Sequence, residues 1–332
     1  MTGAEDCSVR LRTRAPGKVN VCLFVGGMRT DGRHQLVTLF ESVSLADELE
    51  VITGTAHEDQ VVCRPEVRGP NLVSRALAGL RARGWDAPPV TVVIDKRVPI
   101  AGGMGGGSAD AAAMLRVAAR LAPVSAHAID ELAAELGADV PSQLEPGLAI
   151  GTGAGELVEP ARALAPHGFV LVPASVQLPS ATVYARADRL GTIRDAAGLA
   201  ELYERLNAAL AAGEQLPGGL LVNDLEPAAL SLCPAIEQSI AAALKTGADH
   251  AFVCGSGPTV AGLYWGADGA RRAAAAADAL RSEFPGARSA VPVGAVRGPA
   301  RIVDGFDGVC SGCGPLGIRP RPVGPRPSHP AA

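Results

Sequence analysis

A run of glycines in the first third of the chain places the strongest constraint on its fold. Five of the six residues from Gly102 to Gly107 are glycine, and an Ala-rich segment with high helix propensity follows directly. Glycines let the backbone turn tightly and approach a ligand, and a helix start presents unpaired N–H groups and the positive end of the helix dipole. The sequence therefore predicts a phosphate cradle, in which Ser108 caps the helix and offers a hydroxyl to phosphate or metal. A flexible turn is the alternative, but so many glycines without a use would cost chain entropy.

The spacing of these residues excludes the commoner phosphate-binding motifs. A Walker A motif ends in Gly-Lys-Ser/Thr, and no lysine lies in this loop. The dinucleotide pattern G-x-G-x-x-G does not occur in register, and no protein-kinase catalytic loop or D-F-G triplet appears elsewhere. The glycine run therefore predicts a phosphate loop of another kind.

Composition and charge limit the remaining classes of protein. The 332 residues are enough for two domains, and with 48% hydrophobic but only 3% aromatic residues the core must consist mostly of Ala, Val and Leu. A net charge of −4 argues against a general nucleic-acid binder or a polybasic membrane anchor. No apolar run reaches the length of a signal peptide core near the start or of a membrane span later, so a soluble cytoplasmic protein is expected.

The cysteines point to the same compartment, and the C-terminal segment has a composition of its own. The seven cysteines are odd in number and scattered, which suits a reducing compartment better than a disulfide framework. Cys310 and Cys313 form a lone C-x-x-C, and a structural zinc would need two further ligands. The surrounding residues 299–332 are rich in Pro, Gly and Arg and are expected to be disordered.

The hydrophobic pattern predicts a mixed α+β chain. Strands are expected at 8–14, 18–25, 48–53, 60–63, 90–94, 169–173 and 289–293, with an apolar run at 36–45 and a strand–glycine turn–strand unit at 251–264. Helices are expected at 71–83, after the glycine loop, at 129–136, from 180 onward, and at 198–212, 234–245 and 270–284. Ala15-Pro16-Gly17 is expected to break the first strand from the second, and the segment 151–155 to form a hairpin turn.

Several polar residues stand out against this apolar background, each with two interpretations. Lys18 and Asn20 begin a strand two residues apart and so share a face, as a functional pair or as edge charges beside a turn. Asp139 follows a helix end between small and apolar neighbours, as a turn former or as a carboxylate aimed into a cleft. Lys96, ahead of the glycine loop, could assist nucleotide binding or lie at a solvated corner, and His34 is a lone histidine after a polar turn.

Three motifs together resemble those of the GHMP small-molecule kinases. They are Ala15-Pro-Gly-Lys18-Val-Asn20, the glycine loop Pro99–Ala109, and Gly255-Ser-Gly-Pro-Thr259. Further matches resemble the branch that acts on a cytidyl diphosphate methylerythritol in the non-mevalonate isoprenoid pathway: Asp31-Gly-Arg-His34, Ile94-Asp-Lys96-Arg-Val-Pro99, Gly137-Ala-Asp139-Val-Pro141 and Val183-Tyr184. The resemblance covers residues 8 to 295. It implies a two-domain α+β fold, with a half like domain 2 of ribosomal protein S5 at 1–160 and a ferredoxin-like half at 161–298.

The resemblance also implies an activity, the transfer of the γ-phosphoryl group of ATP to the 2-hydroxyl of the methylerythritol moiety. Lys18 and Asp139 would be the catalytic pair, with Mg²⁺ as the cofactor. A carboxylate can accept the proton of an alcohol, and an adjacent ammonium keeps that carboxylate ionised and stabilises developing charge. Phosphoryl transfer is mostly positioning and electrostatics, which the loop amides and the metal would supply.

Binding residues follow from the resemblance position by position. Asn20 and His34 would face the cytidine diphosphate, and Tyr184 would stack on the cytosine. Asn71 and Lys96 would lie near the adenine of ATP, and Ser108 would also serve the metal. The loop residues that would bind ATP are Pro99, Ile100, Ala101, Gly102, Gly103, Met104, Gly105, Gly106, Gly107, Ser108 and Ala109.

The substrate is less constrained than the reaction. The family usually has an aromatic residue where Arg33 stands, and apolar or aromatic residues where Ser142-Gln143 stand. Another GHMP-type kinase, acting on homoserine or a mevalonate-like alcohol, and a catalytically silent ligand sensor are the alternatives. The expected partner is a small molecule rather than a nucleic acid or a membrane, and the expected assembly is a monomer or homodimer.

Overall fold

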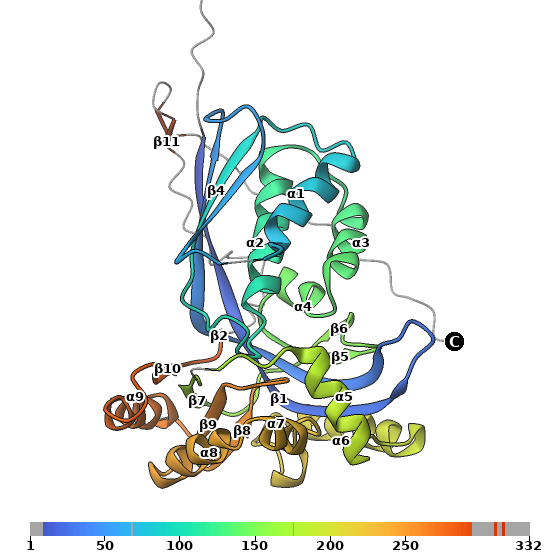
Figure 1. The fold of residues 1–332 in the computed structure, drawn as a ribbon, viewed down its shortest axis with the longest axis vertical. Coiled ribbons are helices and arrows are strands. Elements are labelled where there is room, and N and C mark those ends of the chain that lie inside the picture. Colours follow the sequence, from blue (N-terminus) through green and yellow to red (C-terminus); the bar gives the residue numbers. More distant parts are fainter. Residues whose placement is uncertain (1–8, 68, 175, 294–308, 311–313, 316–332) are drawn as a thin grey trace, which may run out of the picture.

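The computed structural model describes residues 9–67, 69–174 and 176–293, with two short pieces at 309–310 and 314–315. The mixed α+β prediction is confirmed: helices pack on a six-stranded sheet and on a four-stranded sheet, joined by one long β ribbon (Figure 1). The two short pieces pair as β11 (Val309–Cys310) and β12 (Gly314–Pro315). The rest of the tail at 299–332, with Cys313 of the C-x-x-C motif, lies outside the described residues.

The first sheet forms the N-terminal half. Its strands are β1 (Arg10–Met28), β2 (His34–Thr53), β3 (Gln60–Arg64), β4 (Val90–Asp95), β5 (Leu148–Thr152) and β6 (Leu157–Pro160). They run in the order β3-β4-β2-β5-β6, with β1 also paired to β2. On one face lie α1 (Leu72–Ala82), α2 (Gly106–Leu121), α3 (Ala126–Leu136) and the short α4 (Val140–Leu144) (Figure 1). The predicted hairpin turn at 151–155 is confirmed as the connection between β5 and β6.

The β1–β2 ribbon runs the length of the molecule and belongs to both halves (Figure 1). The predicted strand break at Ala15-Pro16-Gly17 is wrong, because β1 continues through it. Between Pro16 and Lys18 the register shifts because Pro16 pairs with Ala46 but Lys18 with Ser42, so the extra residues bulge from β2. Such a β-bulge interrupts the regular ladder and tolerates proline and glycine inside a strand. Beyond the bulge Lys18 and Asn20 do share a face, since the Lys18 Nζ donates to Asn20 Oδ1 at 2.6 Å.

The second sheet forms the C-terminal half. Its antiparallel strands are β7 (His167–Val172), β8 (His250–Val253), β9 (Val260–Trp265) and β10 (Arg288–Ala290), in the order β10-β7-β9-β8. The helices of this half are α5 (Ser180–Leu190), α6 (Ala196–Ala212), α7 (Glu226–Leu232), α8 (Ala235–Lys245) and α9 (Gly269–Leu280), with a 3₁₀ turn at Gly218–Leu220. One core packs this sheet against the ribbon: Phe24 and Leu39 of the ribbon cluster with Phe169 and Leu263. The two halves are thereby fixed to each other by apolar burial.

The helix α2 sets the position of the glycine loop. Its buried face is rich in alanine, with Met114 and Leu115 as its large side chains, and it packs into the core of the first half. The helix begins at Gly106, and its N-cap Gly105 has φ +65°, a left-handed conformation that glycine adopts without strain. The prediction that Ser108 caps this helix is wrong, because Ser108 lies inside the first turn. No side chain caps the start of α2, so its first N–H groups face the cavity described below.

Candidate active site

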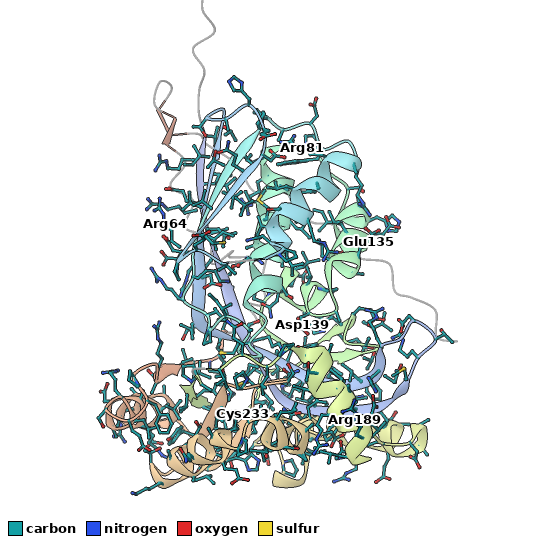
Figure 2. The ribbon with its side chains drawn as sticks, in the orientation of Figure 1. Arg64, Arg81, Glu135, Asp139, Arg189 and Cys233 are labelled. Atoms are coloured by element: carbon teal, nitrogen blue, oxygen red, sulfur yellow. The ribbon has the colours of Figure 1, made fainter. Side chains whose placement is uncertain are left out.

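A cavity of about 780 Å³ lies where the two halves meet. Asp139, one of its lining residues, lies between α4 and α5 (Figure 2). It gathers most of the residues selected from the sequence, although they are far apart in the chain. The predicted residues that line it are Lys18, Asn20, His34, Asn71, Lys96, Asp139, Tyr184, Pro99, Ile100, Ala101, Gly102, Gly103, Gly105, Gly106, Gly107 and Ser108. Met104 and Ala109 do not line it, because their side chains are buried in the apolar cores.

The glycine loop is interlocked with the turn after β8. A Cβ atom on Gly103, whose φ is +79°, would collide with the carbonyl oxygen of Cys254 and lie 2.8 Å from the backbone nitrogen of Gly257. The Thr259 N–H also donates to the Gly102 carbonyl at 3.3 Å. The second small-residue turn therefore reaches the first, as the sequence allowed, and only glycine fits where the backbones touch.

Lys18 and Asp139 form an ion pair beside this loop. The Lys18 Nζ lies 3.5 Å from Asp139 Oδ2, with the lysine side chain 4% exposed and the aspartate 35% exposed. The Lys18 N–H donates to the Met104 carbonyl at 2.9 Å, which ties β1 to the loop. A Cβ on Gly105 would lie 3.2 Å from Lys18 Cε and 3.6 Å from Asp139 Oδ2, so the pair packs directly against the loop backbone.

Local structure holds each member of this pair in place. Asn20 accepts from Lys18 and in turn donates its Nδ2 to Thr38 Oγ1 at 2.8 Å, which orients the ammonium group. Asp139 occupies the N-cap position of α4, with a proline in the first turn of the helix. Its side chain makes no capping hydrogen bond, so the carboxylate lies in the cavity wall. Asp139 thus both starts a turn of helix and faces the cleft, which combines the two interpretations of its sequence.

A buried cluster of charges surrounds Lys96 in the wall of the cavity. The Lys96 Nζ contacts Asp110 Oδ2 at 2.7 Å and also Asp47 Oδ2. The other carboxylate oxygen of Asp47, Oδ1, accepts from the Val98 N–H at 2.8 Å. Burial alone would lower the pKa of Lys96, but the charges of Asp110 and Asp47 outweigh it and raise that pKa. Burial, reinforced by Asp47, raises the pKa of Asp110 to about 7 despite Lys96. Two carboxylates therefore share one buried lysine, which excludes the interpretation of Lys96 as a residue at a solvated corner.

Asn71 is held by its own helix. Its Oδ1 accepts from the Val73 N–H at 2.7 Å as the N-cap of α1, and its Nδ2 donates to Cys63 Sγ at 3.2 Å. The cap fixes this side chain in the cavity wall on the same side as Lys96.

His34, Tyr184 and Asp188 meet at the end of the cavity near α5. The rings of His34 and Tyr184 stack with centroids 5.2 Å apart, and His34 Nε2 lies 2.9 Å from Asp188 Oδ1. Burial, and then the nearby Asp139 carboxylate, raise the pKa of the Tyr184 phenol, so its hydroxyl stays neutral. Sequence reasoning missed Asp188, although its i,i+4 spacing from Tyr184 on a helix was an available signal.

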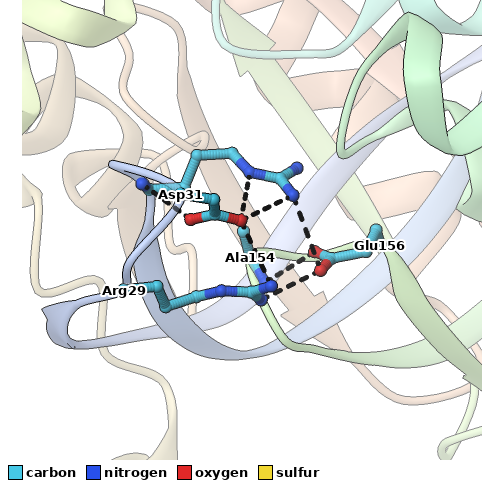
Figure 3. Close-up of polar contacts among 5 residues, drawn as sticks. Arg29, Asp31, Ala154 and Glu156 are labelled. Atoms are coloured by element: carbon cyan, nitrogen blue, oxygen red, sulfur yellow. Dashed lines mark hydrogen bonds and ion pairs between the residues drawn. The ribbon is translucent and has the colours of Figure 1, made fainter.

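A charged network fixes the turn that precedes His34 (Figure 3). Arg29 pairs with Glu156 at 2.9 Å and with Asp31 at 3.2 Å, and Arg33 pairs with Asp31 at 2.9 Å. The Arg33 backbone N–H, above all, lowers the pKa of the Asp31 carboxyl. Arg33 also lies 3.7 Å from Glu156, so two carboxylates balance its positive charge. Arg33 is the residue that stands where the family usually has an aromatic side chain.

The described residues also bear on two further kinds of site, a metal site and a membrane-spanning helix. No group of three or more His, Cys, Asp or Glu side chains in the described part of the chain could hold a metal ion by itself. Ser108 and Asp139 nevertheless bring two oxygen donors to the cavity, and Mg²⁺ commonly takes one or two protein oxygens and completes its shell with phosphates and water. In the part that the structure describes, no helix is long and apolar enough to span a bilayer.

Comparison with known families identifies the class. The family model for the GHMP kinases N terminal domain matches residues 71–147, and the model for the GHMP kinases C terminal domain matches residues 197–286. The chain therefore belongs to the GHMP kinases, and the predicted fold and resemblance are confirmed.

Full-length relatives narrow the assignment to one family. A 4-diphosphocytidyl-2-C-methyl-D-erythritol kinase of Nocardia farcinica is 40% identical over 301 residues, which covers 88% of this chain and 95% of the relative. The enzyme of the same name from Mycobacterium tuberculosis is 41% identical, covering 75% of this chain and 80% of the relative. By these identities the chain belongs to the 4-diphosphocytidyl-2-C-methyl-D-erythritol kinase family.

Solved structures agree with that placement. A crystal structure of 4-(cytidine 5'-diphospho)-2C-methyl-D-erythritol kinase matches with a TM-score of 0.66 and 34% identity over 86% of this chain and 99% of that one. A homoserine kinase from Cytophaga hutchinsonii matches with a TM-score of 0.67 but only 19% identity, over 89% of this chain and 97% of that one. The second match therefore shows a shared fold alone.

Proposed function

We propose that this protein transfers the γ-phosphoryl group of ATP to the 2-hydroxyl of 4-diphosphocytidyl-2-C-methyl-D-erythritol. Membership of the kinase family of that name supports the substrate and the reaction. The observation that carries the chemistry is the Lys18–Asp139 pair at 3.5 Å, packed against the loop that Gly102 to Gly107 form. The Lys96 cluster also joins an ammonium group to carboxylates, but the Asp47 and Asp110 side chains are 0% and 5% exposed, whereas Asp139 is 35% exposed and so open to a substrate.

In this proposal Asp139 takes the proton of the attacking hydroxyl. An alcohol is a weak nucleophile, and a carboxylate within hydrogen-bond reach can accept its proton as the oxygen–phosphorus bond forms. Lys18, held by Asn20, keeps the carboxylate ionised and lies where negative charge develops on the transferred group. The 35% exposure of Asp139 leaves its carboxylate accessible to a bound alcohol.

The glycine loop and the start of α2 would bind the phosphate chain. Uncapped N–H groups and the helix dipole favour an anion at Gly105 and its successors, and the absence of Cβ atoms allows close approach. Ser108 would hold Mg²⁺ together with phosphate oxygens, and the metal would neutralise the phosphate charge when bound. Asn71 and Lys96 line the far end of the same cavity, which suits the adenine of ATP.

The opposite end of the cavity suits the cytidine diphosphate. Tyr184 provides an aromatic face, His34 a polar ring edge, and Asn20 an amide beside the catalytic lysine. Cys22, Cys63, Cys233 and Cys254 are free thiols, which fits an enzyme of the reducing cytoplasm.

A coupled assay of ADP release tests the proposal. The purified full-length chain should turn over ATP with the cytidyl methylerythritol substrate, and much more slowly with homoserine or mevalonate. Preferred phosphorylation of one of those alcohols would replace the proposed substrate. Binding of ATP without turnover of any alcohol would favour a ligand sensor on the same fold.

A further inference from the structure

Asp188 lines the substrate end of the cavity and contacts His34 there. It lies on α5 one helical turn after Tyr184, so both side chains leave the helix on the same face. The carboxylate oxygen Oδ1 lies 2.9 Å from His34 Nε2, and the His34 side chain is only 6% exposed. Stacking on Tyr184 at an interplanar angle of 21° fixes the plane of the same imidazole ring. The ring is therefore held both in its plane and at one nitrogen.

The chemistry of this contact decides which ring nitrogen carries the proton. An ionised carboxylate only accepts hydrogen bonds, so Nε2 of His34 must be the N–H that donates to Asp188. In the neutral ring Nδ1 is then left as an acceptor. Within the described residues Nδ1 has no hydrogen-bond partner, and His34 lines the cavity. An acceptor is thus presented to whatever occupies this end.

We propose that Asp188 is a positioning residue that fixes the Nε2–H tautomer of His34 and thereby selects an amino-bearing pyrimidine over one with a carbonyl. Cytosine carries an exocyclic amino group that can donate to Nδ1. Uracil carries a carbonyl oxygen at that position, which would bring two acceptors together. The inference rests on the proposed function only in assuming that a pyrimidine base occupies this end of the cavity.

The neighbouring charged side chains do not provide another group that could recognise the base. Arg33, the residue before His34, has its guanidinium group bound to Asp31 at 2.9 and 3.1 Å and lies 3.7 Å from Glu156. Its charge is matched by those two carboxylates rather than left for a carbonyl oxygen of the base. Discrimination between amino and carbonyl groups then depends on the protonation pattern of His34.

Binding of CDP and UDP to the full-length protein, measured by calorimetry, tests the inference. The unmodified protein should bind CDP at least about tenfold more tightly than UDP, since a mispaired buried acceptor costs that much. In Asp188→Asn the amide can offer Nε2 either an oxygen or an amino group, so the tautomer is no longer fixed. The CDP/UDP preference should then fall by about tenfold. The matched control Asp278→Asn makes the same change on an exposed residue of α9 and should leave the preference unchanged.

Nitrogen NMR of histidine-labelled protein supplies a readout that does not depend on ligand. The His34 signals, assigned by their loss in His34→Gln, should show a protonated Nε2 and an unprotonated Nδ1. In Asp188→Asn a fraction of the ring should carry the proton on Nδ1 instead. A purely structural role for Asp188 would change neither the tautomer nor the CDP/UDP ratio.

Two results would overturn the inference. One is an unchanged CDP/UDP ratio in Asp188→Asn, and the other is an equal weakening of both ligands, which would mean that Asp188 binds the nucleotide directly. The kinase assay separates this failure from that of the proposed function. A protein that phosphorylates the cytidyl substrate but shows either result refutes only the role of Asp188.

Discussion

Replacing Asp139 by asparagine tests the centre of the mechanism. The amide keeps the size of the side chain but cannot take a proton, so kcat should fall about 10²- to 10⁴-fold, or about 3 to 5.5 kcal/mol of transition-state stabilisation. The fold should survive, because the carboxylate makes no capping bond in α4 and Lys18 keeps its 2.6 Å hydrogen bond to Asn20. Since the Asp139 side chain is 35% exposed, losing the ion pair should cost about 1 kcal/mol of unfolding free energy or less.

The measurements separate a chemical effect from a binding effect. Initial rates of ADP release give kcat, and calorimetry with a non-hydrolysable ATP analogue should give a Kd within about threefold of the original. Asp278→Asn, on the exposed face of α9, is the matched control and should leave both values unchanged. A kcat for Asp139→Asn within about tenfold of the unmodified enzyme would refute a proton-accepting role for this carboxylate.

Two further predictions concern the glycine loop and the buried contact between His167 and Glu41. Gly105→Ala should weaken nucleotide binding and lower kcat about tenfold or more, since its Cβ would lie 3.2 Å from Lys18 Cε. Gly84→Ala is the matched control, because Gly84 also has a positive φ, +79°, but a Cβ there would meet nothing within 4 Å. Calorimetry should show that this variant loses stability, and steady-state kinetics that it keeps its activity. Burial opposes the charged form of His167, but the hydrogen bond that its Nε2 donates to Glu41 raises its pKa above 6.5. His167→Gln should therefore lower Tm most in acid, with a loss that shrinks as pH rises through the raised pKa, and a pH-independent Tm difference would contradict this.

The residues that sequence analysis located correctly carry a local signal. Two-residue spacing placed Lys18 and Asn20 on one face, and the glycine run marked the loop, because strand period and backbone freedom depend only on neighbouring residues. The break expected at Pro16 failed for the opposite reason. Whether a proline ends a strand or enters a bulge depends on the partner strand β2, which lies more than twenty residues away in the chain.

The residues that it missed act through distant partners. Asp47 is a single acid within a strand, and its importance comes from Lys96 and from the Val98 N–H some fifty residues later. Asp188 acquires its role only where α5 of one half meets the start of β2. The helix α4 was missed because five residues leave no periodic pattern to detect. Long-range pairing of this kind is invisible to propensity and spacing.

The contact between Gly103 and the Cys254–Gly257 turn has a consequence for how the enzyme is assembled. The loop that would seat the nucleotide belongs to the first half of the chain, but its shape depends on backbone atoms supplied by the second. An isolated N-terminal fragment would carry every glycine of the motif and still lack the support that gives them their curvature. Competence to bind a triphosphate thus depends on the docking of the two halves.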